Sequence, residues 1–277
     1  GVASCVYVYV NGELIGYAED SYTGKTFNIT DAVKFGKENL VVFQVYKYCD
    51  ASYLEANDSV KLGGIYRDVY LYAAPEAQIR DFSYDMQMSG SDALMNVSVS
   101  LASYEKVKRD LTVNLSIYDK DGNCVYQPAQ VGAVAAFSEK VASNANAYLA
   151  EVGSRVSVPN PKLWSAETPN LYTVVLELMD GDKVLDTVSK RIGFRTVGVS
   201  LDDEGTQSLL LNGEKVSLRG VLYNENSAVT GMAISREEMI SDIKQMKELN
   251  VNAVRSPGRP LSEEFISLCD EYGLYVI

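Results

Sequence analysis

Hydrophobic and polar residues alternate with a period of two over most of residues 1–197, and a helical spacing replaces this pattern in the last part of the chain. Residues 6–10 read Val-Tyr-Val-Tyr-Val and precede Asn11-Gly12, the pair most typical of a two-residue hairpin turn. Further strand-like runs at 40–46 and 65–72 are separated by turn residues. Many short strands of this kind predict a sandwich or jelly roll over residues 1–78.

A second run of alternating segments fills residues 79–197. Strand patterns occur at 95–101, 111–118 and 173–178, and the pairs Asp121-Gly122 and Asp180-Gly181 after the last two favour hairpin turns. About seven such strands are typical of an immunoglobulin-like β-sandwich. The Cys-Trp-Cys core pattern of antibody domains is missing, and Trp164 lies in a proline-rich connection.

The pattern changes in residues 198–277. We expect a hairpin from 209–213 and 216–221, then a loop over 222–234. Ser235 and Glu238 have the spacing of a capping box, and apolar residues follow it at helical intervals. The remaining expected elements are a strand at 251–255, a helix at 262–272 with Ile266 and Cys269 facing inward, and an apolar strand at 274–277. Helices that alternate with strands predict a (β/α) barrel or a doubly wound sheet.

Composition excludes several classes of protein. The 277 residues are 47% hydrophobic and 22% charged, as in a globular protein. No apolar run approaches the roughly 18 residues of a membrane helix, and the first residues lack the basic region of a signal peptide. The formal charge of −12 and the lack of a Lys/Arg cluster argue against nucleic-acid binding.

The cysteine and histidine content limits the catalytic mechanisms that the chain could support. The four cysteines are far apart in the sequence and form no C-x-x-C pair, so we expect free thiols in a reducing, cytoplasmic compartment. The chain contains no histidine. This absence excludes a Ser-His-Asp or Cys-His mechanism within it and leaves carboxylates as acid/base groups.

Several stretches together resemble glycoside hydrolase family 2, and most closely its β-galactosidases. The resemblance rests on VYVNGELIGYAEDSYTGKTFNIT, SYLEANDSVKLGGIYRDVYLYAAP, PNPKLWSAETPNLYTVVLEL, LLLNGEKVSLRGV, DIKQMKELNVNAVR and LCDEYGLYVI, in the family's order. It implies a multidomain, mainly β chain with three parts: a partial jelly roll (1–78), an immunoglobulin-like sandwich (79–197) and the truncated start of a (β/α)8 barrel (198–277).

The same resemblance implies retaining hydrolysis of β-glycosides by two glutamates on barrel strands later than the third. We therefore expect no catalytic residue in this chain, which is similar to the middle of a longer enzyme, and we expect the isolated chain to be inactive. A longer relative would use Na⁺ and Mg²⁺, whereas we expect no cofactor within the chain itself.

Two residues match positions that act in the family. Asp58 matches an aspartate that contacts the sugar and a sodium ion, although Val60 replaces the tryptophan that usually follows it. A solvated loop carboxylate or a turn-forming residue is the alternative for Asp58. Arg255 matches an arginine that pairs with the nucleophilic carboxylate, and the alternative there is a surface or interdomain ion pair.

Two family histidines are replaced. Asn224 stands where a substrate-contacting histidine is expected, and Gly258 stands at the place of another. An asparagine can still hydrogen-bond a sugar hydroxyl, but a glycine has no side chain to do so. Glu225 keeps its family place, either as a residue of the sugar site or as a solvated loop charge.

These departures leave three hypotheses. The first is a section of a β-galactosidase-like hydrolase that acts on a carbohydrate. The second is a non-catalytic carbohydrate-binding or structural remnant of that family. The third is a β-sandwich interaction module with a β/α tail. An open edge and apolar faces near Ile277 also predict self-association, or packing of this tail against the sandwich.

Overall fold

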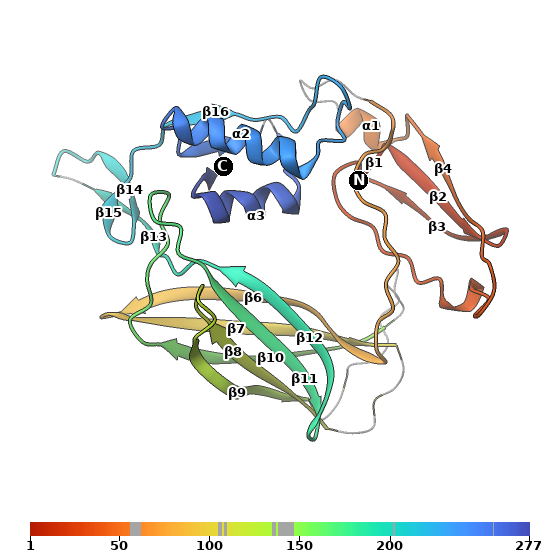
Figure 1. The fold of residues 1–277 in the computed structure, drawn as a ribbon, viewed down its shortest axis with the longest axis horizontal. Helices are drawn as coiled ribbons and strands as arrows, with labels where there is room; N and C mark the ends of the chain where they lie inside the picture. Colours follow the sequence, from red (N-terminus) through yellow and green to blue (C-terminus); the bar gives the residue numbers. More distant parts are fainter. Residues whose placement is uncertain are drawn as a thin grey trace. The chain divides into compact units, whose positions relative to one another are not determined.

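The computed structural model describes residues 1–55, 62–104, 107, 110–134, 137, 147–201, 203–256 and 258–277. It divides into two compact bodies. The first comprises Gly1–Leu71, Arg219–Cys269 and Leu274–Ile277, and the second comprises Tyr72–Leu218 and Asp270–Gly273. Figure 1 labels most elements of both bodies.

The N-terminal part of the first body is built on a three-stranded antiparallel sheet in the order β3-β2-β4. Asn11 and Gly12 have φ values of +53° and +88°, so the predicted hairpin turn between β2 and β3 is confirmed. The elements of this part are β1 (Val2–Ala3), β2 (Cys5–Val10), β3 (Glu13–Glu19), the 3₁₀ helix η1 (Thr30–Ala32), β4 (Val41–Tyr46), α1 (Ala51–Leu54) and β5 (Gly64–Ile65), which pairs with β1.

The C-terminal part of the first body is a parallel sheet in the order β16-β17-β18, with helices between its strands. Ser235 and Glu238 make both bonds of a capping box, which begins α2 as predicted. The elements are β16 (Gly220–Leu222), α2 (Arg236–Glu248), β17 (Ala253–Arg255), α3 (Glu263–Tyr272) and β18 (Tyr275–Val276). This strand-helix-strand rhythm is the predicted beginning of a barrel.

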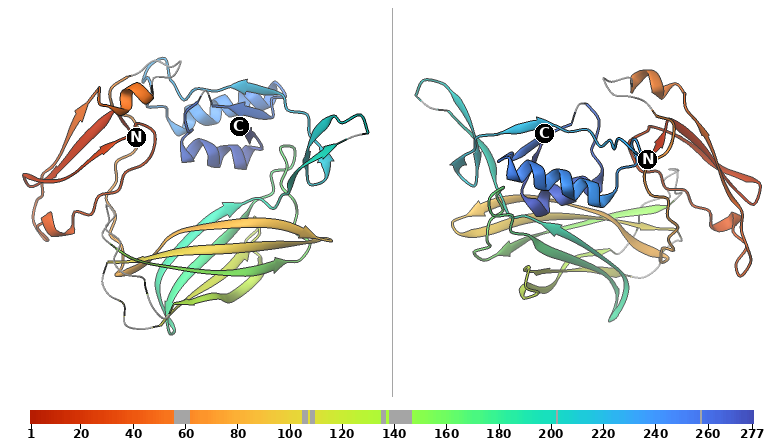
Figure 2. Two further views of the ribbon diagram at one scale, coloured as in Figure 1. Left: turned by 180° about the vertical axis from the view of Figure 1, so that it is seen from behind. Right: turned by 45° about the horizontal axis from the view of Figure 1, so that its top comes forward.

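The second body is a two-sheet sandwich, seen from two further sides in Figure 2. Its sheets have the orders β10-β7-β6 and β12-β11-β8-β9, and they share one core of buried, mostly aliphatic residues. The strands are β6 (Ala77–Ser89), β7 (Asp92–Ser103), β8 (Leu111–Tyr118), β9 (Cys124–Val134), β10 (Tyr148–Val158), β11 (Tyr172–Asp180) and β12 (Lys183–Ile192). A small third sheet follows, formed by β13 (Val197–Leu201), β14 (Gln207–Leu211) and β15 (Glu214–Lys215).

Trp164 is a core residue of the second body although its sequence context indicated only a connection. Its side chain is 1% exposed, and its Nε1–H donates to the Asp270 carbonyl at 2.8 Å. The Arg195 guanidinium lies 4.8 Å from its ring centre. The chain has a single tryptophan, so its fluorescence reports on the surroundings of Trp164.

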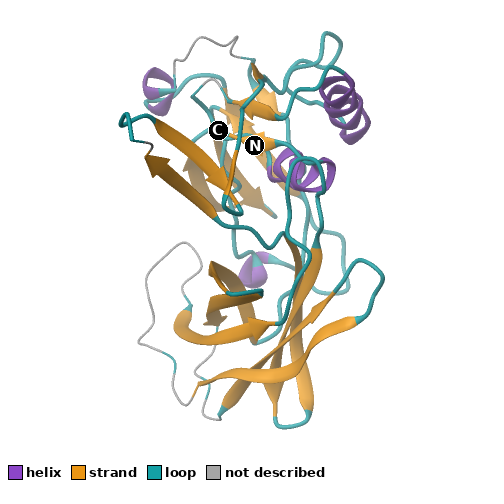
Figure 3. Cartoon of the chain, turned by 90° about the vertical axis from the view of Figure 1, so that its left-hand side faces the viewer, coloured by secondary structure: helices purple, strands orange, loops and turns teal. Residues whose placement is uncertain are grey.

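The mainly β fold, with a β/α part at its C-terminal end, is confirmed (Figure 3). Several local predictions are wrong. Ile266 is 40% exposed because the buried face of α3 consists of Phe265, Leu268 and Cys269, and Ile266 lies to one side of it. The predicted strand at 65–72 is reduced to β5, because within the described residues no strand pairs with its remainder.

The predicted hairpin from 209–213 and 216–221 is also wrong in its second half. The returning strand β15 has only two residues, and the chain then enters β16, which pairs in parallel with β17. No described helix is long and apolar enough to cross a membrane.

Because of its place in the sandwich core, we expect Leu176→Ala to cause a large loss of stability. Leu176 is fully buried on β11, so we expect the free energy of unfolding of the second body to fall by about 2–5 kcal/mol. Urea unfolding followed by Trp164 fluorescence measures this loss. Leu201→Ala is the matched control, because Leu201 is 68% exposed on β13. Equal effects of the two substitutions would contradict the assignment of the core.

Candidate functional site

The candidate site lies in the loops that follow the parallel strands β16 and β17. Asn224 and Glu225 are the second and third residues after β16, and Arg255 is the last residue of β17. Because the carboxyl ends of parallel strands meet at one edge of a sheet, these residues share the edge where (β/α) barrels carry their active sites.

The Glu225 carboxylate is the most highly bonded group at this edge. It is 7% exposed, and the Ser262 backbone N–H lies 3.0 Å from each of its oxygens. The Ser262 hydroxyl donates to Oε1, while it accepts from the Phe265 N–H at 3.2 Å and so begins α3. Glu225 therefore joins the β16 loop to the first turn of a helix.

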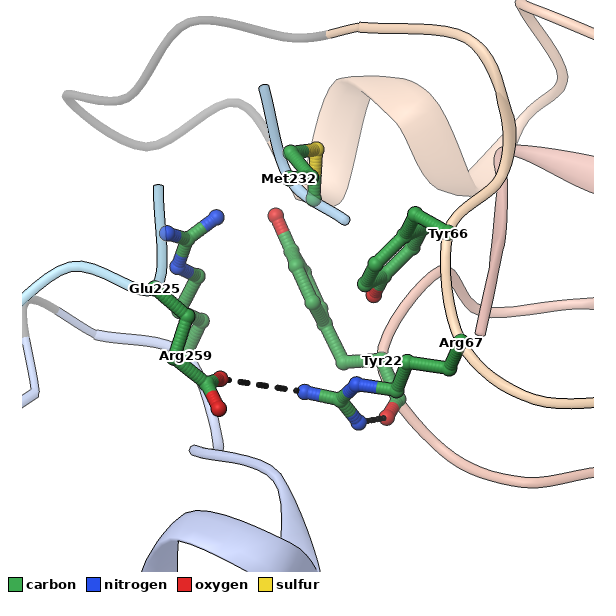
Figure 4. A pocket seen from close by; sticks show the side chains of 6 residues that line it. All are labelled: Tyr22, Tyr66, Arg67, Glu225, Met232 and Arg259. Atoms are coloured by element: carbon green, nitrogen blue, oxygen red, sulfur yellow. Dashed lines mark hydrogen bonds and ion pairs between the residues drawn. The ribbon is translucent and has the colours of Figure 1, made fainter. Parts of the chain in front are cut away.

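Arg67 brings a third segment to the same carboxylate. Its Nη2 lies 3.3 Å from Glu225 Oε2, and its Nη1 donates to the Tyr22 carbonyl at 2.5 Å (Figure 4). The neighbouring Tyr66 hydroxyl donates to the Ser21 carbonyl at 2.5 Å. The jelly-roll part and the parallel part of the first body are thus tied together at Glu225.

These side chains leave almost no free space between them. The cavity between them is about 10 Å³, which is the room of one water molecule. It is lined by Tyr22, Tyr66, Arg67, Glu225, Met232 and Arg259. The cavity cannot hold a sugar ring, so the cluster around Glu225 acts as a junction.

Arg259 connects the two loops at the strand ends. It is 7% exposed, its Nη2 lies 3.3 Å from Asn224 Oδ1, and its guanidinium lies 5.9 Å from the Tyr22 ring centre. Gly258 has a φ of +80°, a conformation that favours glycine, immediately before this arginine. Asn224 itself is exposed, so its amide faces solvent at the strand edge.

Arg255 presents its guanidinium to solvent. Its carbonyl accepts from the Tyr223 N–H at 3.0 Å, which fixes the backbone at the end of β17. Within the described part of the chain, its side chain makes no hydrogen bond or ion pair. An exposed cation at this edge is suited to pairing with a carboxylate.

Asp58 lies outside the described residues, so its predicted contacts with a sugar and with sodium stay predictions. Among the residues the structure does describe, no group of three or more Cys, Asp and Glu side chains could hold a metal ion. The expected use of Na⁺ and Mg²⁺ by a longer relative is likewise a prediction.

Sequence reasoning placed Asn224, Glu225 and Arg255 at the edge but missed their partners. Arg67 and Arg259 carried no local signal, because each acts through a residue at least 35 positions away. The one usable hint was Ser262, a helix-capping residue type at the predicted start of a helix.

Three family models match the chain in succession. They are the sugar binding domain of glycosyl hydrolases family 2 at residues 1–75, glycosyl hydrolases family 2 at 77–195, and its TIM barrel domain at 201–277. A jelly-roll part, a sandwich and a parallel β/α part in this order define a multidomain glycosidase scaffold. The chain belongs to glycosyl hydrolase family 2.

Curated relatives include β-galactosidases. That of Priestia megaterium is 38% identical and that of Streptococcus thermophilus 36% identical, each over the whole of this chain. The matches cover 26% and 25% of those proteins, so the chain spans about a quarter of their length. Among solved structures, a β-glucuronidase of Bacteroides uniformis superposes with a TM-score of 0.84 at 25% identity, covering 99% of this chain and 32% of that one.

We expect Glu225→Gln to destabilise the first body at this junction. The substitution keeps the shape but removes the charge that neutralises Arg67, and breaking a buried pair of this kind costs about 3 kcal/mol. Hydrogen exchange of peptides from residues 219–269 should rise, while the Trp164 unfolding midpoint of the second body stays unchanged.

Glu13→Gln is the control for that experiment, because Glu13 is an exposed residue of β3 in the same body. Unchanged exchange in the Glu225→Gln variant would show that the carboxylate does not hold the loops together.

Burial raises the pKa of Tyr66 to about 12, against the opposing effect of the Arg67 charge. Because an unfolded tyrosine loses its proton near pH 10, the folded body holds more protons between about pH 10 and 12, and its stability falls across this window. The difference between the ultraviolet titration curves of the unmodified chain and Tyr66→Phe isolates this hydroxyl. We expect its midpoint near pH 12, and a midpoint near pH 10 would refute the burial argument.

Proposed function

We propose that this chain is part of a longer retaining glycoside hydrolase that acts on β-galactosides. The observation that carries the proposal is the unbroken series of three family 2 models, together with β-galactosidase relatives that match the whole chain at 33–38% identity. Retaining hydrolysis uses one carboxyl group as nucleophile and one as acid and base, about 5–5.5 Å apart. By the family resemblance, both come from barrel strands beyond the three described here.

In this proposal Arg255 supplies the charge that keeps the nucleophile ionised. An opposite charge within about 4–6 Å lowers the pKa of a carboxyl group by roughly 1–3 units. The exposed guanidinium at the end of β17, with no partner among the described residues, supports this role.

Asn224 and Glu225 have different roles in this proposal. The exposed Asn224 amide can donate to a sugar hydroxyl while its Oδ1 accepts from Arg259. Glu225 is buried and accepts from Ser262 and Arg67, which supports a positioning role for the Asn224 loop over direct contact with the sugar.

A second candidate function is carbohydrate binding without turnover. The presence of Asn224 and Gly258 at two positions where the family resemblance leads us to expect histidines favours it. Both candidates take a carbohydrate as ligand. Self-association and a cytoplasmic location stay predictions from the sequence.

The test is turnover of a β-galactoside by the gene product that contains this chain. We expect hydrolysis by the longer protein and none by residues 1–277 alone. Arg255→Ala should lower kcat/KM of the longer protein by about 10²-fold and move the acid limb of its pH profile upward, because the nucleophile loses its cation.

Arg80→Ala is the control, since Arg80 is an exposed residue of the sandwich. An unchanged acid limb in Arg255→Ala would remove the proposed role of the arginine. Saturable galactoside binding by the longer protein without any turnover would favour the second candidate.

A further inference from the structure

Two of the four cysteines are neighbours in the jelly-roll part of the first body. Cys5 begins β2, and in the antiparallel pairing of β2 with β4 it lies opposite Tyr46. The chain stays next to β2 beyond this pair, because the Ser4 hydroxyl donates to the Lys47 carbonyl at 2.8 Å. Cys49 follows two residues later, and both cysteines line the same groove at the sheet.

The two thiols differ in exposure. Cys5 is 3% exposed, Cys49 is half-buried, and neither is part of a disulfide bond. Burial raises the pKa of the Cys5 thiol, a hydrogen bond from Tyr17 opposes this rise, and the neighbouring Cys49 adds to it. A dissolved reagent therefore reaches Cys49 more readily than Cys5.

Both cysteines are held by the surrounding structure. Cys5 is fixed by its ladder partners on β3 and β4. The backbone N–H of Cys49 donates to the Ser52 hydroxyl at 2.9 Å, and the Cys49 sulfur lies 3.7 Å from the same oxygen, so the first turn of α1 positions this residue. A bond between two side chains on ordered backbone requires little further ordering of the folded chain.

We propose that Cys5 and Cys49 form a reversible disulfide bond when the protein meets a low-molecular-weight disulfide such as oxidised glutathione. The Cys49 thiolate attacks one sulfur of the reagent, and the first reagent thiol leaves with the proton that Cys49 has lost. The Cys5 thiolate then attacks the Cys49 sulfur of this mixed disulfide, and the second reagent thiol leaves with the proton from Cys5. The two cysteines are thereby oxidised, and the reagent is reduced to two thiols.

The bond closes residues 5–49 into a covalent loop that contains β2, β3 and β4. Such a loop stabilises the folded state mainly by restricting the unfolded chain. It also fixes the start of α1, whose other end is followed by Glu55, and the Glu55 carboxylate accepts from the Ser21 N–H at 2.8 Å. We therefore expect slower hydrogen exchange in peptides from residues 49–55 after oxidation. The thiols share no residue with the cavity beside Glu225, so the proposal does not depend on hydrolysis.

The experiment exposes the folded, reduced chain to oxidised glutathione, blocks the remaining thiols with iodoacetamide and maps every cysteine by peptide mass spectrometry. We expect a linked pair of Cys5 and Cys49 peptides that disappears after treatment with dithiothreitol. Cys124 is the internal reference, because it is half-buried like Cys49 but has no second cysteine in its body. Glutathione that reacts with Cys124 should stay there as a mixed disulfide.

Cys5→Ser separates the two steps of the reaction. It should retain about ten times more glutathione on Cys49 than the unmodified chain does, because the neighbouring thiol that displaces the reagent is gone. Cys49→Ser should leave Cys5 largely unmodified, since that thiol is buried. Cys124→Ser is the matched control and should form the link as the unmodified chain does.

The central measurement uses the unmodified chain, so it decides the proposal even if a substituted chain fails to fold. Glutathione that stays on Cys49, a Cys49 that does not react, a link that forms only in urea, or a link between two chains overturns the proposal. The longer gene product should form the same link. Its failure to do so overturns the proposal as well, because another segment then keeps the reagent from Cys49.

Discussion

One buried carboxylate organises the first body. Glu225 is removed from water, and a charge in that position is tolerated only if donors replace its hydration. Those donors come from Ser262, 37 positions away, and from Arg67, 158 positions away. Satisfying one side chain therefore fixes three segments at once: the loop after β16, the first turn of α3, and the strand end of the jelly-roll part. The exposed Asn224 owes its position at the strand edge to its covalent link with this anchored residue.

Elements whose determinants are local could be predicted from the sequence. The capping box of Ser235 and Glu238 and the Asn11-Gly12 turn each involve residues within one turn of backbone, and both form as predicted. Ile266 shows the opposite case. Its apolar side chain fits an inward position by composition, but the face that α3 buries is chosen by what packs against it. The alternating segment 65–72 fails for a similar reason, because a strand requires a partner to complete its hydrogen bonds.

In the candidate site, too, some features could be predicted from the sequence and others could not. The edge position of Asn224, Glu225 and Arg255 follows from the order of strands and loops, which the sequence pattern reveals. The direction in which a long side chain points does not follow from that order. Arg259 reaches Asn224 because Gly258 adopts a φ of +80° and because the Tyr22 ring offers the guanidinium a surface. The alternating valines and tyrosines of β2 likewise indicate a two-faced strand, yet only packing decides that the valines face the core.

The Asn224–Arg259 pair changes how this edge responds to pH. The family resemblance leads us to expect histidines at positions 224 and 258, and a histidine changes its charge between about pH 5 and 8. This chain has no histidine, and a guanidinium stays charged throughout that range. The amide oxygen of Asn224 accepts from Arg259 irrespective of pH, so this contact between the two loops does not weaken as the pH falls. Two imidazoles in these positions would repel each other once both were protonated. The two replacements are therefore linked physically: glycine at 258 gives the loop its turn, and the arginine that follows supplies a permanent donor to asparagine 224.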